Sequence, residues 1–469
     1  MVRRTLVLAA AAALSGCTVV GPDYHVPDAA MVNAPIAQGA FQSGSVVTTQ
    51  EPLPDHWWRL YEDPVLDRLI EQAFLANTDL RVAEANLERS LALLDERNVG
   101  REIQGSVNAE TSWAQRSAEA ELSHVKPPTR QIYNMGIGAS YDLDLFGGIR
   151  RGIEAANADA EAAVAARDLV RVTVAAETAR AYADICNAGY QRTVLDRAIA
   201  VLEQSVRLTR IMVSHGRAAP YELDRRQALL ETSKARLPRL VARQRNALFR
   251  VTALAGRTPG EADPGLLACH APLALRRVIP VGDGAALLKR RPDIRMAERR
   301  LAATTARIGV ATADLYPDIR LGASVGSTGA AADFLSPLTN RFGLGPMISW
   351  TLNRHAVRAR IAATEAQSRG DLAAFDGVVI KALREVETAL TNYAAGLEQQ
   401  QGLDRASEDA ARAAMRVGQL RRGGKIAALP ALEAERDRVA ADQAAAEARA
   451  AINDDQITLF LALGGGWSN

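Results

Sequence analysis

Cysteine is scarce in this sequence, with 3 residues among 469, and aromatic residues make up only 5%. Cys186 and Cys269 are far apart in the chain, and no Cys-x-x-Cys motif occurs. This usage favours neither a disulfide framework nor a zinc site. A bridge between these two cysteines stays open as an alternative, but two unlinked thiols are the preferred interpretation. The six histidines are scattered, so we expect no metal site and no cofactor.

The chain also lacks an excess of charge of either sign. Its 56 basic residues oppose 54 acidic ones, for a net charge of +2, which gives no reason to expect a nucleic-acid partner. No apolar run reaches the about 20 residues of a membrane-spanning helix. The Gly136-Ile137-Gly138 triplet lacks the third glycine of a dinucleotide loop, and no serine has the context of a nucleophile elbow. We therefore expect no catalytic residue and no enzyme.

The N-terminus contains the pattern of a secretory signal. Arg3 and Arg4 precede an apolar run that ends in Leu14-Ser15-Gly16-Cys17. Residues 1–16 are predicted to be the signal peptide. Leu14, Ser15 and Gly16 resemble a bacterial lipobox, in which Cys17 would carry a covalent lipid. Thr18, rather than Asp, follows the cysteine, and by the same resemblance this favours the outer membrane. Residues 17–55 would then form a lipid-anchored extended segment.

The sequence repeats itself. Asp79–Leu87 recurs as Asp293–Leu301, and Glu177 and Ala181 correspond to Glu385 and Ala389. Units of this size are too large for solenoid repeats, so the pattern indicates one duplicated unit. The predicted halves are residues 56–257 and 284–463, with a linker at 258–283 and a tail at 464–469. Each half has the order helix, two strands, very long helix, helix.

Four predicted strands alternate apolar with small or polar residues. They span residues 104–113, 132–143, 318–327 and 341–352. In the first, Val107, Ala109, Thr111 and Trp113 alternate with polar side chains, so one face of the strand is apolar. Segments of about ten residues suit strands that cross a bilayer. Because four strands cannot close a barrel, a shared barrel of three chains is predicted. The competing interpretation is a soluble sheet half-buried on a core.

The long helices are predicted over residues 149–214 and 356–421, each followed by a second helix, at 220–256 and 430–462. No proline occurs between Pro128 and Pro220, or between Pro346 and Pro430. Apolar residues recur at alternating steps of three and four, which is typical of a coiled-coil seam. A helix of this size would be on the order of 100 Å long. The seam residues are Leu195, Ile199, Leu202, Val206, Thr209 and Val213, then Leu383, Val386, Leu390, Tyr393 and Leu397.

The order of short motifs resembles a known family over essentially the whole mature chain. The motifs are Pro22, Tyr24 and Pro27 after Cys17; Trp57-Trp58-Arg59-Leu60-Tyr61-Glu62-Asp63-Pro64; Tyr141-Asp142-Leu143-Asp144-Leu145-Phe146-Gly147-Gly148; Arg290-Arg291-Pro292-Asp293-Ile294; Ile308-Gly309-Val310-Ala311; Tyr316-Pro317; and Ala462 to Trp467. Together they resemble the outer-membrane factors of tripartite efflux pumps, the TolC/OprM-like family, and its NodT-type lipoproteins. One departure is Leu352-Asn353-Arg354-His355-Ala356, where relatives commonly carry Phe-Asp-Gly-Gly, so this turn is expected to differ.

The resemblance implies a mixed α/β membrane protein that is mainly α. It would be a homotrimer with a twelve-strand β-barrel in the outer membrane, continuous with a long periplasmic α-helical barrel. The chain would be a passive exit duct for small molecules such as drugs or toxic compounds. Its implied partners are a periplasmic membrane-fusion adaptor, an inner-membrane transporter of the resistance-nodulation-division type, and outer-membrane lipid.

The turns that follow the two long helices are the candidate contact with the adaptor. Glycine after a helix and proline at the start of the next suit a sharp reversal. The candidate tip residues are Gly216, Arg217, Ala218, Ala219, Gly423, Gly424, Lys425 and Ile426. Charged residues next to these turns are candidates for a gate at the closed end. They are Arg421, Arg422, Glu433 and Arg436 in the second half, and Glu222, Asp224 and Arg225 in the first.

Two other functions compete with an efflux duct. An exit duct for protein secretion or for metal efflux would have the same architecture. A structural lipoprotein, such as a periplasm-spanning coiled-coil spacer, belongs to a different class. Strand pairs with an apolar face of bilayer length distinguish the duct from a spacer, because a spacer has no use for them.

Overall fold

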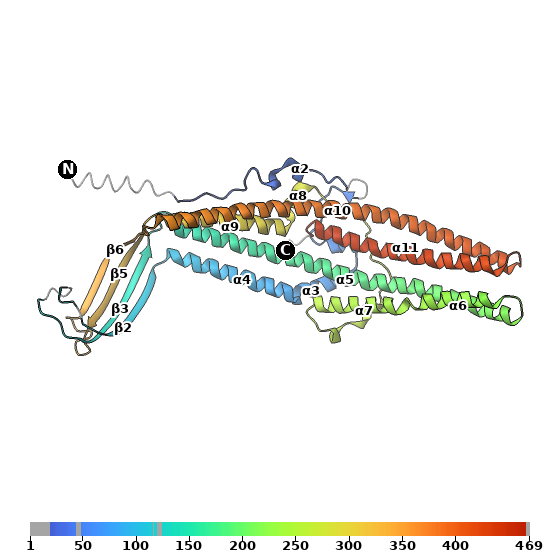
Figure 1. Cartoon of the computed structure of the whole chain (residues 1–469), viewed down its shortest axis with the longest axis horizontal. Helices are drawn as coiled ribbons and strands as arrows, with labels where there is room; N and C mark the ends of the chain where they lie inside the picture. The colour runs from blue at the N-terminus through green and yellow to red at the C-terminus, as the bar shows by residue number, and fades with distance from the viewer. Residues whose placement is uncertain (1–18, 44–47, 116, 120–123, 466–469) are drawn as a thin grey trace. The chain divides into compact units, whose positions relative to one another are not determined.

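The computed structural model describes residues 19–43, 48–115, 117–119 and 124–465 (Figure 1). The lipobox residues Leu14, Ser15, Gly16 and Cys17 lie outside the described residues. The main elements are α3 (Pro64–Ala76), α4 (Thr78–Asn98), β2 (Gln104–Ala114), β3 (Arg130–Asp142), α5 (Gly148–Ser214), α6 (Pro220–Lys234), α7 (Leu237–Leu254), α8 (Gly284–Arg290), α9 (Pro292–Ala313), β5 (Asp318–Gly329), β6 (Asn340–Ser349), α10 (Arg354–Arg422) and α11 (Ala428–Ala462). The fold is mainly helical, as predicted.

The described residues divide into two compact units. The first comprises the described parts of Met1–Pro27, Asn86–Val164 and Met296–Phe375. The second comprises those of Asp28–Ala85, Ala165–Arg295 and Asp376–Asn469. Each unit therefore draws on both halves of the sequence, because the long helices α5 and α10 contribute residues to both.

The first unit contains an antiparallel sheet with the strand order β2-β3-β5-β6 (Figure 1). Three strands lie within two residues of their predicted bounds, but the strand predicted over 341–352 is too long, since β6 ends at Ser349. Ser349 pairs with Asp318, the first residue of β5, so the residues after it have no partner on that strand. The turn that follows begins α10, where the Asn353 side chain accepts a hydrogen bond from the amide of Ala356 (3.4 Å).

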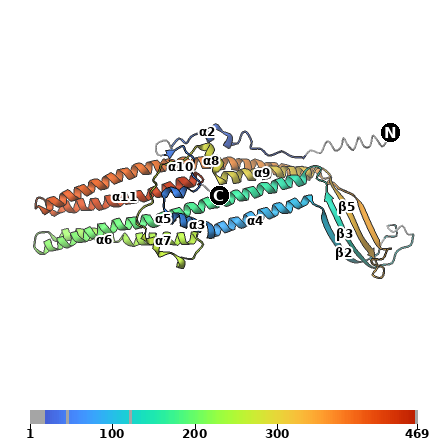
Figure 2. The same cartoon turned by 180° about the vertical axis from the view of Figure 1, so that it is seen from behind.

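The second unit contains two helix pairs that the coiled-coil seam predicts. In both views α6 lies beside the C-terminal part of α5, and α11 beside that of α10 (Figures 1 and 2). Leu202 and Val206 of the predicted seam are buried and pack with Leu230 of α6. The single helix predicted over 220–256 is wrong, because α6 ends at Lys234 and α7 starts at Leu237. Pro238 has no amide hydrogen and fits only the first turn of a helix, which accounts for the break.

Large aromatic residues fill the core of the second unit. Trp57 is buried and stacks on Phe460 of α11, with ring centroids 4.5 Å apart. Arg291 is also buried, and it donates a hydrogen bond to the carbonyl of Ala462 at the end of α11 (2.7 Å). It pairs with Asp293 (2.7 Å) and with a carboxylate of α10. A buried guanidinium is stable here because carboxylates and a helix C-terminus surround it. These contacts give a structural role to two of the motifs.

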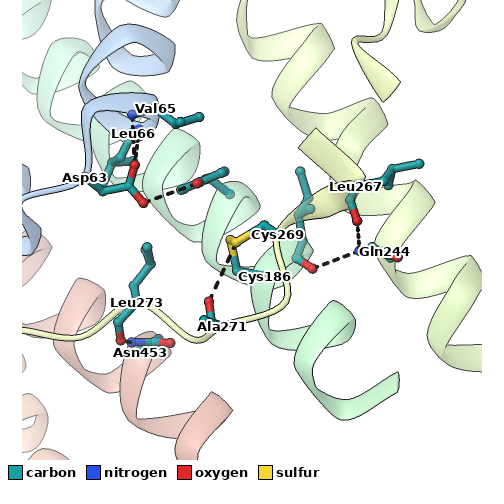
Figure 3. Close-up of a disulfide and its surroundings, with 12 residues drawn as sticks. Asp63, Val65, Leu66, Cys186, Gln244, Leu267, Cys269, Ala271, Leu273 and Asn453 are labelled. Atoms are coloured by element: carbon teal, nitrogen blue, oxygen red, sulfur yellow. Dashed lines mark hydrogen bonds between the residues drawn. A yellow bond between two sulfur atoms is a disulfide. The ribbon is translucent and has the colours of Figure 1, made fainter. Parts of the chain in front are cut away.

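The expectation of two unlinked thiols is wrong: Cys186 and Cys269 form a disulfide, with their Cα atoms 4.7 Å apart (Figure 3). Cys186 lies on α5 and Cys269 in the segment that connects the two halves. Gly189, one turn after Cys186, allows this approach, since a Cβ there would collide with the carbonyl of Cys269. Gln244 of α7 donates a hydrogen bond to the carbonyl of Leu267 (3.1 Å) and holds the same segment. The bond could not be predicted from the sequence, because Cys186 and Cys269 are far apart in the chain and only the fold brings the connecting segment next to α5.

Candidate functional site

One face of the sheet is apolar and exposed. Val107, Ile137, Val325 and Phe342 form a row across the four strands. Their exposed fractions range from 59% for Ile137 and Val325 to 90% for Phe342. Water disfavours contiguous apolar area of this kind, so such a face marks a surface that contacts a membrane or a partner.

The opposite face of the sheet is lined mostly by small and polar residues. Gly138, Ser324 and Gly343 form one row of this face. Along each strand, the residues of this row alternate with residues of the apolar face. At the helix end of the sheet, Arg320 pairs with Asp142 (2.7 Å) and with Asp318 (2.9 Å). The sheet is therefore two-sided in the way that a strand between lipid and water requires. Within the described residues, no strand of this chain covers the outer edges of β2 and β6.

The N-terminal segment is attached where β3 leads into α5. The amide of Val20 donates to the carbonyl of Phe146 (3.1 Å), beside Gly147, whose φ is +79°. Arg151 of α5 is only 4% exposed, and its guanidinium donates to the carbonyls of Val20 (3.1 Å) and Gly21 (3.2 Å). It also forms ion pairs with Asp23 and Glu154. The described chain thus starts at the strand-to-helix junction.

The candidate tip residues lie in two turns of the same geometry. Gly216 and Gly424 have φ values of +68° and +69°, in the left-handed region that glycine tolerates. The amide of Arg217 donates to the carbonyl of Met212 (2.8 Å), and the amide of Lys425 donates to that of Leu420 (3.0 Å). Both are the hydrogen bonds of a Schellman motif, which ends a helix sharply.

A groove of about 670 Å³ lies beside these turns in the second unit. The residues that line it come from both helix pairs. They are Leu208, Met212, Arg217 and Glu222 from the first, and Gly418, Arg421, Arg422, Gly424, Ile426 and Ala427 from the second.

The candidate gate residues are only partly brought together. Arg421 points its guanidinium at the sulfur of Met212 on α5 (3.3 Å), and Glu222 lines the groove. Arg422 donates to a carbonyl of its own helix, and Arg436 pairs with the adjacent Asp437 (3.3 Å). The remaining three, Asp224, Arg225 and Glu433, are exposed. Among the described residues, no ion pair joins a candidate of the first half to a candidate of the second.

An ion pair between a buried arginine and a half-buried glutamate lies one or two residues away from these candidates. Arg226 of α6 is only 1% exposed, hydrogen bonds to Ser205 of α5 and forms an ion pair with Glu435 of α11 (3.8 Å). Burial raises the pKa of the Glu435 carboxyl, although Ser205 and Arg226 act in the opposite direction. Burial lowers the pKa of Arg226, and the charge of Arg421 adds to this effect.

The spacing of the sequence contained a signal for Arg226. It follows Leu223 by three residues and precedes Leu230 by four, so it occupies a core position of the seam. An arginine at such a position requires a carboxylate as partner, and Glu435 on the neighbouring helix pair supplies it. Sequence reasoning selected the neighbours Arg225, Glu433 and Arg436 instead.

Neither a metal centre nor a membrane-spanning helix is found in the part of the chain that the structure describes. No group of three or more His, Cys, Asp and Glu side chains in this part has an arrangement suited to a metal ion. None of its helices combines the length and the apolar character needed to cross a membrane.

Comparison with known proteins gives one consistent result. A family model described as "Outer membrane efflux protein" matches residues 69–257 and 285–465. The chain is 30% identical to the solvent efflux pump outer membrane protein SrpC of Pseudomonas putida, over 97% of this chain and 96% of that protein. It is 28% identical to the toluene efflux pump outer membrane protein TtgC of the same species, over 97% of this chain and 93% of that protein. The solved outer-membrane channel OprN matches with a TM-score of 0.87 and 32% identity, over 96% of this chain and 99% of that chain.

Proposed function

Because this chain belongs to the outer membrane efflux protein family, we propose that it is the exit duct of a tripartite efflux pump. Three copies would conduct small molecules passively from a periplasmic adaptor and an inner-membrane transporter to the exterior. The observation that carries this proposal is the two-sided sheet, apolar and exposed on one face and mostly small or polar on the other. The names of SrpC and TtgC favour small organic compounds as cargo.

The edges of the sheet support the proposed homotrimer. Backbone groups of an open edge cannot stay without hydrogen bonds in hydrocarbon, so a lipid-facing sheet has to close. The four strands of one chain are too few, since membrane barrels start at about eight. Pairing of β6 with β2 of the next copy would close a barrel of twelve strands. The long helices would then surround a continuous pore below the barrel.

Lipid attachment at Cys17 is consistent with the position of the N-terminal segment. Val19 and Val20 lie at the strand-to-helix junction, which in the proposed arrangement is the periplasmic surface of the outer membrane. Cys17 precedes Val19 by two positions, a stretch of chain that spans at most about 7 Å. A lipid on Cys17 would therefore reach the inner leaflet without any rearrangement of Arg151 and its partners. No other cofactor is proposed.

We propose that the adaptor docks at the two turns with Schellman geometry. Gly216 and Gly424 end the long helices there, and the groove of about 670 Å³ offers a partner both apolar and charged groups. The transporter would contact the duct or act through the adaptor, and a member of the resistance-nodulation-division type is proposed on the family resemblance.

We also propose that Arg421 and Arg422 help to hold the periplasmic end closed. Arg421 already crosses from α10 to Met212 of α5, and it lies close enough to Arg226 to lower the pKa of that group. Threefold symmetry would bring three such clusters toward one axis. The remaining candidates, Glu222, Asp224, Arg225, Glu433 and Arg436, are proposed as partners across the subunit boundaries.

Replacing Arg421 and Arg422 with serine should raise the single-channel conductance, because the contact between the helix pairs and the positive charge at the closed end are both removed. The measurement is planar-bilayer recording of the purified double variant. Arg416→Ser is the matched control, since Arg416 is an exposed arginine of the same helix and is not among the gate candidates. Conductance equal to that of the unmodified channel would contradict the role of Arg421 and Arg422.

The function itself is tested on detergent-extracted protein. We expect a species of trimer mass, discrete and uniform conductance steps in a planar bilayer, and an N-terminal peptide with lipid on Cys17. Recording the Arg421→Ser, Arg422→Ser variant in parallel keeps a closed periplasmic end from hiding the pore. A monomer with no conductance in either form would contradict the shared barrel and favour the coiled-coil spacer.

A further inference from the structure

One arginine lies on the polar face of the sheet, near its loop end. Arg341 is the second residue of β6, and the register places it in one row with Gly326, Gly136 and Asn108. Because strand side chains alternate between faces, Arg341 points away from the apolar face of Phe342. If this polar face is the pore wall, as the proposed function has it, Arg341 belongs to that wall.

Two glycines form the surface on which the Arg341 side chain lies. A Cβ at Gly136 would be 3.0 Å from its Nη2, and a Cβ at Gly326 would be 3.3 Å from its Cζ. Both distances are shorter than ordinary van der Waals contacts, so any larger residue would displace the guanidinium. The side chain thus extends across β5 toward β3 instead of projecting freely into solvent.

Neutral groups hold the guanidinium in this position. Its Nε donates to Oγ1 of Thr328 (3.0 Å) and its Nη2 donates to Oδ1 of Asn134 (2.8 Å). The Thr328 hydroxyl donates to the same Asn134 oxygen (3.0 Å), which fixes the amide with its oxygen toward the arginine. A guanidinium has five N–H donors, so about three are left for another acceptor. Neither partner neutralises its positive charge.

The other charges on this face do not cancel Arg341. Arg320 lies toward the helix end of the sheet, where Asp142 and Asp318 neutralise it. Glu110 lies opposite Asn134 on β2, and Arg130 lies on the same face of β3, four residues before Asn134. In the part of the chain that the structure describes, no ion pair joins Arg341 to a carboxylate. The loop end of the face therefore carries one net positive charge per chain from Arg341, Arg130 and Glu110.

We propose that Arg341 is an anion-binding group of the pore wall, near the outer end of the duct. It would favour passage of solutes that carry a carboxylate, phosphate or sulfonate group, because the fixed guanidinium presents N–H donors in a fork that matches these anions. In the trimer, three copies would form a cationic ring. The inference rests on the proposed function, since it takes the polar face of the sheet as the pore wall.

The test measures the local electrostatic potential with a reporter thiol at Ser324→Cys. Ser324 is exposed on the polar face, one row from Gly326. Cys186 and Cys269 are bonded to each other and do not compete for the reagent. Intact cells are treated with membrane-impermeant methanethiosulfonates, one anionic (sulfonatoethyl) and one cationic (trimethylammonioethyl), and the two labelling rates are compared. External labelling needs no open periplasmic end.

Arg341→Gln should lower the ratio of anionic to cationic labelling about threefold, as expected for loss of a unit charge about 7 Å away at a Debye length of about 10 Å. Arg341→Lys should keep most of the ratio, and about 1 M salt should abolish the difference between the variants. A ratio unaffected by Arg341→Gln would overturn the role of Arg341 and leave the proposed duct intact. If the reporter is not labelled from outside by either reagent, the polar face is not a pore wall, and both proposals fail.

Discussion

An arginine in place of Val107 should prevent the chain from accumulating in the outer membrane, whereas an arginine in place of the neighbouring Ser106 should be tolerated. Val107 is 67% exposed on the apolar face and lies in the row of Ile137, Val325 and Phe342. Ser106 points to the opposite face, toward Gly138. The two substitutions add the same charge to adjacent residues of one strand, so only the environment of each face separates them.

The expected difference is large. An arginine on the lipid face of a membrane barrel costs about 2–4 kcal/mol at the bilayer midplane, while a lumen-facing arginine remains hydrated. The proposed trimer contains the substitution three times, which multiplies the cost by three. We expect little or no Val107→Arg trimer in isolated outer membranes, and Ser106→Arg trimer at close to the unmodified amount.

The measurement is the amount of trimer in the outer-membrane fraction after density-gradient separation, detected by immunoblot. Total cellular protein serves as the reference for expression. Equal amounts of trimer for the two variants would show that the apolar face does not contact lipid. Loss of both trimers would point to a general folding defect of β2. The comparison would then be repeated two residues further along the strand, with Ala109→Arg on the apolar face and Asn108→Arg on the polar face, to separate a folding defect from an effect of lipid contact.

Removing the disulfide should have the second large effect. The bond between Cys186 and Cys269 closes a loop of 83 residues that includes α6 and α7. In the chain-entropy model a cross-link of this span contributes about 4.5 kcal/mol, because it restricts the unfolded chain. Gln244 and Asn453 would still hold the connecting segment through its carbonyls, so we expect weakening of this region and not loss of the fold.

Cys186→Ser with Cys269→Ser should therefore lower the melting temperature by about 5 °C or more and expose the segment at 258–283 to protease. Differential scanning calorimetry and limited proteolysis measure the two effects. Each single variant should match the double variant, since either one removes the same bond. A reducing agent should destabilise the unmodified protein and leave the double variant unchanged. Identical melting of the oxidised protein and the double variant would contradict this account.

Elements with a strong period could be predicted from the sequence. Strict alternation located β2, β3 and β5 to within two residues, and the heptad seam together with the proline-free stretches located α5 and α10 equally well. The two errors in the bounds of elements occurred where neither the alternation nor the heptad spacing indicates an end. Pro238 interrupts the predicted helix at 220–256, and the end of β6 depends on where its partner β5 begins.

The candidate site shows the same division. Glycine and proline were sufficient to place the turns at Gly216 and Gly424, because the left-handed conformation is a local requirement. The ion pair of Arg226 and Glu435 was missed, because a charge at a seam position is recognised only with its partner on another helix. Arg341 was missed for a similar reason, since the surface on which its side chain lies consists of glycines from two other strands.

The sequence by itself determined the order of elements, the two-sided character of the strands and the family resemblance, all of which depend on residues close together in the chain. Only the tertiary structure decided which distant residues meet. Three interactions join segments that are separated in sequence: the Cys186–Cys269 bond, the ion pair of Arg226 and the hydrogen bond from Arg341 to Asn134. The physical reason is that side-chain periodicity follows from backbone geometry within one element, whereas disulfides, buried charges and hydrogen-bonded arginines depend on packing between elements.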